Sequence, residues 1–196
     1  MNHTDAKAAL RASIIDQRDA IPAADRAARC ALLLQDVLAL PQVACAQRVF
    51  AFVSHGSEVE THPIIDALLD AGKQVAVPLI LPRKDDPDRR MLAVPIRSRD
   101  ELTPGVMGIP SPPIPETPDP APETRFHPDL VLVPGVAFQA LTPKKIARLG
   151  YGGGYYDRYL ARHPAAITVG LSFREQLIEA LPTESHDVPL NGLLHC

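Results

Sequence analysis

The sequence predicts a three-layer α/β/α fold, in which helices cover both faces of an open, mainly parallel sheet, as a single domain over residues 1–196. Short apolar runs alternate with segments that have helical spacing. Two of these runs flank one helix within about 30 residues, an order that requires parallel strands and a right-handed crossover. The length of 196 residues, with 46% apolar and 22% charged residues, fits one hydrophobic core of ordinary size.

Four helices are predicted, over residues 5–19, over residues 24–40, from Thr61 to Gly72 and from a start near Gly154. In the first helix, Lys7 and Arg11 lie one turn apart beside an apolar stripe. Pro41 ends the second helix. Pro63 falls in the first turn of the third helix, where the missing N–H costs nothing, and the Thr61 side chain is expected to cap that helix.

Five strands are predicted from short apolar runs bounded by turn residues, at residues 49–53, 74–78, 91–96, 130–133 and 166–170. The first two enclose the third helix and form the βαβ unit. Residues 83–90 and 139–147 are predicted to be loops. Residues 110–128 contain eight prolines, which excludes a helix or a central strand. We expect an extended surface loop over 110–128, and a linker between two domains is the alternative.

Composition and charge argue against several classes of protein. The net charge of −3 provides no general attraction to nucleic acid or anionic lipid. No apolar run approaches the ~18 residues of a membrane helix, and the first residues lack the apolar stretch of a signal peptide. Cys30, Cys45 and Cys196 lack zinc-ligand or CxxC spacing, so we expect reduced thiols, with a redox or metal role as the alternative. The expectation is a cytoplasmic protein with no nucleic acid or membrane partner.

The most distinctive segment runs from Arg148 to Tyr159 and reads RLGYGGGYYDRY. It contains all four tyrosines and four of the eleven glycines of the chain. Glycines let backbone N–H groups approach an anion closely and permit positive φ angles. The helix that follows adds the unpaired N–H groups of its N-terminus. Together these features predict a phosphate-binding turn, and a flexible turn with tyrosines packed in the core is the alternative.

Charged and aromatic side chains in this segment favour the same interpretation. Arg148 offers a permanent charge and two parallel N–H donors for phosphate oxygens. Asp157, in the first helical turn, is placed to reach a divalent cation bound to those phosphates. Tyrosine rings offer flat faces to a planar ligand. The segment lacks the Lys-Ser/Thr of a Walker A loop and the spacing of a dinucleotide-binding GxGxxG motif.

The same segment resembles the signature of the 5-formyltetrahydrofolate cyclo-ligase family, whose members are also called 5,10-methenyltetrahydrofolate synthetases. That signature is Arg-Leu-Gly, a glycine-rich turn and Tyr-Tyr-Asp. Weaker similarities cover most of the chain in the family's order, at Lys7, Arg11, 52–54, 58–61, 108–109, 134–138, 169–171, Gln176 and 186–187. The resemblance implies a three-layer α/β fold, in agreement with the predicted strands and helices.

The resemblance also implies an ATP- and Mg²⁺-dependent cyclisation of 5-formyltetrahydrofolate to 5,10-methenyltetrahydrofolate. Carried over by position, it implies ATP contacts from Lys7, Arg11, Arg148, Leu149, Gly150, Tyr151, Gly152, Gly153, Gly154, Tyr155 and Tyr156. It implies folate contacts from Val53, Glu58, Tyr151, Gly152, Gly153, Gly154 and Tyr155. The implied Mg²⁺ ligands are Asp157 and Asp187, and the expected catalytic residues are Arg148 and Tyr155.

The implied reaction accounts for these residue types. An N-formyl group is an amide, so its carbon is a poor electrophile and its oxygen a poor leaving group. Phosphorylation of that oxygen corrects both faults, and N10 of the folate then closes the ring. Such a reaction needs two aligned ligands and neutralised phosphate charge. Lys7, Arg11, Arg148 and Mg²⁺ supply the charge, and the Tyr155 hydroxyl is expected at the formyl or phosphoryl group.

Other interpretations stay open at this point. Lys7 and Arg11 also fit a solvated helix face, Glu58 a loop cap and Asp187 a surface turn. For the whole chain, the alternatives are a non-catalytic protein that binds folate or nucleotide and an unrelated phosphoryl-transfer enzyme. We expect a monomer or a weak dimer. The chain departs from the family's usual residues at Leu79, Ser111 and Gln139, and its loop over 139–147 is longer than usual.

Overall fold

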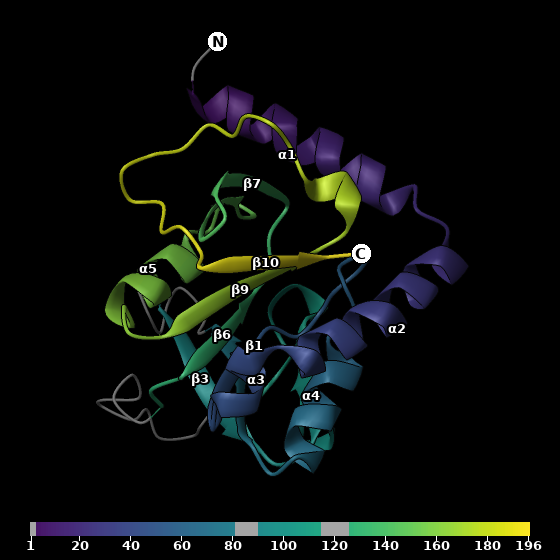
Figure 1. Cartoon of the computed structure of the whole chain (residues 1–196), viewed down its shortest axis with the longest axis vertical. Coiled ribbons are helices and arrows are strands. Elements are labelled where there is room, and N and C mark those ends of the chain that lie inside the picture. Colours follow the sequence, from purple (N-terminus) through teal and green to yellow (C-terminus); the bar gives the residue numbers. More distant parts are fainter. Residues whose placement is uncertain (1–2, 81–89, 115–125) are drawn as a thin grey trace.

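The computed structural model describes residues 3–80, 90–114 and 126–196 (Figure 1). Its α-helices are α1 (His3–Asp19), α2 (Ala23–Ala39), α3 (Pro41–Cys45), α4 (His62–Asp70) and α5 (Tyr155–Arg162). Its strands are β1 (Arg48–Ala51), β2 (Gln74–Ile80), β3 (Met91–Ile96), β4 (Thr103–Pro104), β5 (Pro110–Ser111), β6 (Leu130–Val133), β7 (Ala137–Thr142), β8 (Lys145–Leu149), β9 (Ile167–Ser172) and β10 (Gly192–His195). Short 3₁₀ turns cover Arg99–Glu101, Val106–Gly108 and Arg174–Gln176.

Six strands form the central sheet, in the order β10-β9-β6-β1-β2-β3. Neighbouring strands are parallel, except at the edge where β3 pairs antiparallel with β2. The chain passes from β1 through α4 to its neighbour β2, and from β6 through α5 to its neighbour β9. The predicted βαβ unit and the mainly parallel sheet are therefore confirmed.

Side chains alternate between the two faces of this sheet. Val49 and Ala51 of β1 belong to a buried cluster with residues of α2, α3 and α4, which Figure 1 shows grouped together. Phe50, between them, belongs to a second cluster with residues of α5, β7 and β8. This period of two places helices on both faces of one sheet. The predicted three-layer α/β architecture with a single domain is confirmed.

The prediction of a loop over residues 139–147 is wrong. These residues form most of an antiparallel hairpin, in which Phe138 pairs with Arg148 and Gln139 with Ala147. Phe138 and Ile146 are buried in the core, while Pro143 falls in the turn between the strands. The segment from Arg148 to Tyr159 therefore begins inside β8, and its glycines follow the strand directly. Neither strand alternates buried and exposed residues, so the period-two signal of a strand is missing from this stretch. Pro143 and Lys144 in the turn favour a loop on sequence grounds.

Helix α1 packs on this hairpin, away from the central sheet (Figure 1). Ile14 shares a buried cluster with Ala147 and Leu149 of β8. Two charged residues on the same stripe of α1, Lys7 and Arg18, are also buried. The contact with β8 places this stripe of α1 beside the glycine-rich segment, which begins where β8 ends.

The predicted proline-rich loop is described only in part. Pro110 and Ser111 form β5, which pairs with β4, and residues 115–125 lie outside the described residues, as do residues 81–89. Across the described ranges, none of the helices combines the length and apolar character needed to span a bilayer.

Candidate functional site

A cavity of about 530 Å³ opens at the carboxyl ends of β1 and β6. These strands are neighbours, and the chain leaves them in opposite directions, from β1 toward β2 and from β6 toward β9. Open α/β sheets bind ligands at such a switch point. Phe52 and Val53 follow β1, Pro134 follows β6, and all three line the cavity. The fold therefore places a cavity, the candidate binding site, where the strand order reverses.

All of the predicted site residues line this one cavity. They come from four parts of the chain: helix α1, the loop after β1, the glycine-rich segment after β8, and residues 184–187. One wall is apolar and includes Ile80, Met91 and Ile109. The cavity thus combines charged groups with a surface suited to a flat organic ligand.

The glycine-rich segment makes a tight turn before α5. Gly152 has a φ angle of 100° and Gly154, the N-cap of α5, has a φ angle of 65°, both in the region that favours glycine. A Cβ atom on Gly150 would lie 2.7 Å from Nη1 of Arg148. Arg11 lies against the turn and donates from Nε to the Gly150 carbonyl oxygen at 2.8 Å. The turn therefore presents backbone and a guanidinium group to the cavity.

Arg148 is buried beneath this turn. Its Nη2 donates to Oδ2 of Asp157 at 2.9 Å, and its Nη1 donates to the Pro134 carbonyl oxygen at 3.4 Å. Its Nε is buried and finds no hydrogen-bond partner among the described residues. Asp157 also accepts the Val188 N–H at 3.2 Å. Asp157, expected as a metal ligand, is therefore the ionic partner of Arg148 in this structure.

Lys7 meets two carboxylates on the loop before β10. Its Nζ lies 2.7 Å from Oε2 of Glu184 and 3.2 Å from Oδ2 of Asp187. Burial lowers the pKa of Lys7, but the hydrogen bonds to the two carboxylates outweigh it, so the pKa is raised overall. The same contact lowers the pKa of Glu184. Lys7 is therefore a buried cation held by two ion pairs, and not a solvated side chain on the helix surface.

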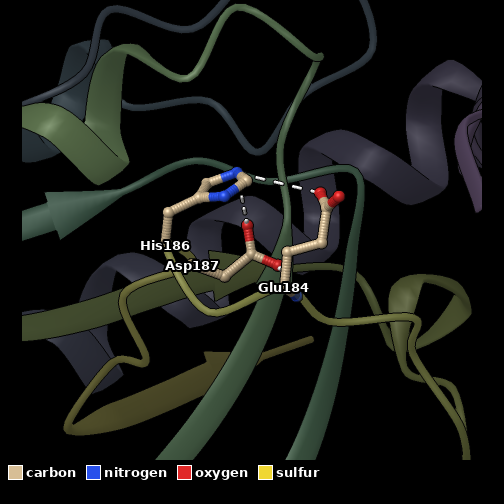
Figure 2. Close-up of side chains that lie close together, drawn as sticks. All are labelled: Glu184, His186 and Asp187. Carbon is tan, nitrogen blue, oxygen red and sulfur yellow. Dashed lines mark hydrogen bonds and ion pairs between the residues drawn. The ribbon is translucent and has the colours of Figure 1, made fainter.

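Figure 2 shows that Glu184 and Asp187 lie close to His186. One potential ligand atom from each of the three lies within 4.8 Å of the others. Asp187 was predicted as a metal ligand, whereas Glu184 was missed, and Asp157 is not part of this group. The spacing Glu-x-His-Asp was visible in the sequence, but its proximity to Lys7 required the fold, because 177 residues separate Lys7 from Glu184.

On the opposite side, a hydrogen-bonded chain connects α1 to the loop after β1. Nη1 of Arg18 donates to the Tyr151 hydroxyl at 2.8 Å, which donates to Oε1 of Glu58 at 2.6 Å. Burial and the nearby Glu58 carboxylate raise the pKa of Tyr151. The Thr61 hydroxyl donates to the Phe52 carbonyl oxygen at 2.7 Å and accepts the Ser54 N–H at 3.0 Å. Thr61 therefore shapes the turn around Val53, and its expected side-chain cap of α4 is not formed.

Sequence reasoning missed Arg18. The signal was present, because Lys7, Arg11, Ile14 and Arg18 follow one another at steps of four, three and four residues on one face of α1. The predicted stripe contained only apolar residues, and the charged residues Lys7 and Arg11 were assigned to a neighbouring face of the helix.

The tyrosines of the segment divide between cavity and core. Tyr155 and Tyr156 line the cavity, and the guanidinium of Arg158 lies 5.2 Å from the Tyr155 ring centre. Tyr156 stacks on Phe50 at 6.1 Å, and burial raises its pKa. The Tyr156 hydroxyl has no partner in the described part of the chain. Tyr159 packs at 4.6 Å from Phe50 in the core beneath the site.

Chemically, the cavity offers cations beside a glycine-rich turn, and carboxylates on both sides. Lys7, Arg11 and Arg148 suit an anionic ligand such as a phosphate chain. Glu58 offers acceptors to a ligand that carries N–H groups. Leu149 lines the cavity, but its side chain is buried against Ile14, so we expect only its main chain to face a ligand.

Comparisons with known proteins give one result. The model of the 5-formyltetrahydrofolate cyclo-ligase family matches residues 3–195 of this chain. The 5-formyltetrahydrofolate cyclo-ligase of Escherichia coli K12 is 33% identical over 160 residues, covering 81% of this chain and 82% of that protein. The mouse (Mus musculus) 5-formyltetrahydrofolate cyclo-ligase is 31% identical over 198 residues, covering 97% and 93%.

Solved structures agree with these relatives. The structure of Aquifex aeolicus 5,10-methenyltetrahydrofolate synthetase superposes with a TM-score of 0.76 at 26% identity, over 96% of this chain and 89% of that one. A 5,10-methenyltetrahydrofolate synthetase from Mycoplasma pneumoniae, at 21% identity and a TM-score of 0.69 over 95% and 96% of the two chains, shares the fold. A match along almost the whole chain, with relatives above 30% identity, shows that the chain belongs to the 5-formyltetrahydrofolate cyclo-ligase family of ligases.

Proposed function

We propose that this chain catalyses the ATP- and Mg²⁺-dependent cyclisation of 5-formyltetrahydrofolate to 5,10-methenyltetrahydrofolate, releasing ADP and phosphate. Family membership indicates cyclo-ligase activity on this folate. The observation that carries the rest is the composition of one cavity. Lys7, Arg11 and Arg148 meet around the glycine-rich turn, and Val53 and Glu58 line the same cavity. A phosphate chain and a flat N–H-bearing ligand would therefore be held next to each other.

The residues divide into two groups in this proposal. The nucleotide phosphates lie against the turn from Gly150 to Gly154 and the N-terminus of α5, because free N–H groups and the helix dipole favour an anion there. Arg11 and Lys7 add charge, and the buried Nε of Arg148, which has no partner among the described residues, provides a further donor. The folate lies between Glu58 and the apolar wall of Ile80, Met91 and Ile109.

The proposed chemistry proceeds in two steps. The formyl oxygen attacks the γ-phosphorus of ATP, the bond to the β-phosphate oxygen breaks, and ADP leaves. N10 then attacks the activated formyl carbon, loses its proton, and the carbon–oxygen bond breaks to release phosphate. The Tyr155 hydroxyl, which lines the cavity next to the turn, donates to the reacting oxygen in this proposal. No covalent enzyme intermediate is needed.

The donor set fits a magnesium ion. Asp157, Glu184 and Asp187 bring carboxylate oxygens to the cavity, and Mg²⁺ prefers hard oxygen ligands. When bound with the nucleotide, the ion would neutralise phosphate charge. In the present structure these carboxylates are engaged by Arg148 and Lys7. The carboxylates would therefore exchange a side-chain cation for the metal.

One coupled assay tests the proposal. The protein is incubated with Mg²⁺, ATP and 5-formyltetrahydrofolate, and both methenyl absorbance and ADP are followed. Equal amounts of the two products support the proposed function. Binding of either ligand without product indicates a non-catalytic binding protein, and ADP release only with another acceptor indicates a different phosphoryl-transfer enzyme. Omitting Mg²⁺, with excess EDTA present, is the matched control.

We also propose that the protein acts in the cytoplasm as a monomer or weak dimer, without a nucleic acid or membrane partner. The net charge of −3 supports the absence of a general attraction to polyanions. Sedimentation equilibrium across a hundredfold range of concentration tests the assembly state, and a stable dimer throughout would contradict it.

A further inference from the structure

Arg18 lies outside the cavity but is bonded to Tyr151, which lines it, and to Ser57, the chain neighbour of the lining residue Glu58. It is 5% exposed, near the end of α1. Its Nε donates to Oγ of Ser57 at 2.9 Å, and its Nη1 donates to the Tyr151 hydroxyl at 2.8 Å. One guanidinium therefore connects the loop after β1 to the glycine-rich turn.

The hydrogen bonds that run from Arg18 through Tyr151 to Glu58 can be donated in only one direction. A guanidinium has N–H donors and no acceptor. The Tyr151 oxygen must therefore accept from Arg18, and the Tyr151 proton is left to point at Oε1 of Glu58, 2.6 Å away. The raised pKa of Tyr151 keeps that proton in place. Glu58 is consequently an acceptor, held from one side by a hydroxyl.

The other oxygen of Glu58 is also held. Oε2 accepts the His55 N–H at 3.0 Å, within the same short loop. Ser57, the neighbour of Glu58, is bonded to Arg18 on one side and to the Asp19 carboxylate on the other. Each carboxylate oxygen has about two lone-pair sites, and Glu58 lines the cavity, so its oxygens can accept further hydrogen bonds from a ligand there.

We propose that Arg18 is a positioning residue for the folate side of the site: through Ser57 and Tyr151 it orients Glu58 as an acceptor pair for the N–H edge of the bound ring system. This inference rests on the proposed function for the identity of the ligand. The arrangement selects a planar ligand with two adjacent N–H donors over one that presents acceptors at that edge, because acceptors would face the Glu58 carboxylate.

The test compares R18Q, R18K and Y151F with a matched control, R29Q. Arg29, like Arg18, binds two side chains through its guanidinium group. Its partners are Asp25 and Glu175, in ion pairs, and it does not line the cavity. Dissociation constants for 5-formyltetrahydrofolate and for ATP are measured separately by calorimetry. R18Q and Y151F should each weaken folate binding about tenfold, the loss of one hydrogen bond to a charged group. ATP binding should change less than about twofold, because the proposal assigns the backbone of the turn to the nucleotide, whereas the Tyr151 hydroxyl is engaged by Arg18 and Glu58.

Two further readouts separate positioning from general damage. R18K keeps the charge but lacks the rigid fork, so its loss should fall between those of wild type and R18Q. The double variant R18Q/Y151F should be no worse than either single variant, because both break the same chain. R29Q should match wild type. Equal weakening of both ligands, or additive losses in the double variant, would overturn the proposal.

A ligand-free measurement keeps this result distinct from the proposed function. Amide hydrogen exchange at His55, followed by NMR, reports whether Glu58 is held, because that N–H bonds to Oε2 of Glu58. Exchange should be faster in R18Q and Y151F than in wild type and R29Q. If wild type lacks turnover but His55 behaves this way, the proposed function fails and the positioning role stands. Unchanged exchange in Y151F, whose half-exposed ring stays in place, refutes the role even if R18Q does not fold.

Discussion

Replacing Asp157 by Asn should destabilise the protein by an amount that the geometry sets. The Arg148 and Asp157 side chains are 4% and 16% exposed, and their Nη2 and Oδ2 atoms lie 2.9 Å apart. Removing one partner of a buried ion pair costs about 3–5 kcal/mol, because the other charge is left uncompensated. Asn keeps an oxygen acceptor for Arg148, so we expect about 3 kcal/mol, the lower end of that range.

The assay is reversible urea unfolding, supported by thermal melting. A loss of 3 kcal/mol corresponds to a drop of roughly 6–12 °C in Tm for a chain of this size. D157N should remain folded at 25 °C but lose cyclo-ligase turnover. The control is D25N, which removes a half-exposed partner of Arg29 and should cost less than about 1 kcal/mol.

A double-mutant cycle decides whether the ion pair is the cause. In R148Q/D157N, neither charge is buried alone, so the variant should be more stable than the sum of its single losses predicts, by more than about 1 kcal/mol. Strict additivity, or a D157N protein as stable as D25N, would refute the reasoning. In either case Arg148 would not depend on Asp157 for its compensation.

Three other outcomes are expected. G152A should lower the free energy of unfolding by about 1–3 kcal/mol and weaken ATP binding, because the φ angle of 100° strains any other residue. The control is G192A, where a Cβ would meet nothing closer than 3.9 Å. Equal losses of stability for the two variants in urea unfolding would contradict this prediction. Hydrogen bonds from Arg48 lower the pKa of Asp129 to about 2, so its contribution is present above pH 3.8 and is lost as pH falls through about 2; acid unfolding of D129N should lack that step. K7M should weaken ATP binding in calorimetry about tenfold with little change in folate binding, and the reverse pattern would contradict the assigned side of the cavity.

The sequence predicted the architecture because its signals were local. Residues 91–96 and 130–133 were assigned with the bounds that the structure has, since each is a short apolar run bounded by turn residues. The hairpin of β7 and β8 was missed because its pairing partners surround a turn of Pro143 and Lys144, which is typical of a loop. The short strand β10 was also missed, because its partner β9 is the only sign of it and lies 20 residues earlier.

Many of the residues that line the cavity could be predicted from the sequence, but their contacts with one another could not. The glycine-rich segment carries its own motif, so the residues from Arg148 to Asp157 could be found without a structure. The pairing of Arg148 with Asp157 and of Lys7 with Glu184 could not, because each group also suits a ligand. The role of Arg18 depends on where α1 packs, and that packing is set by Ile14 against β8.

The contact of Lys7 with Glu184 and Asp187 joins segments separated by 177 and 180 residues. A nascent chain still on the ribosome lacks those two carboxylates until translation has passed position 187. Sheet strands β1, β2 and β6 have by then all been synthesised, so a core can assemble before the cavity is closed on that side. The ability to bind a ligand in this cavity should therefore be gained late in synthesis. A chain that terminates before position 187 should lack that ability, whereas its hydrophobic core can still form.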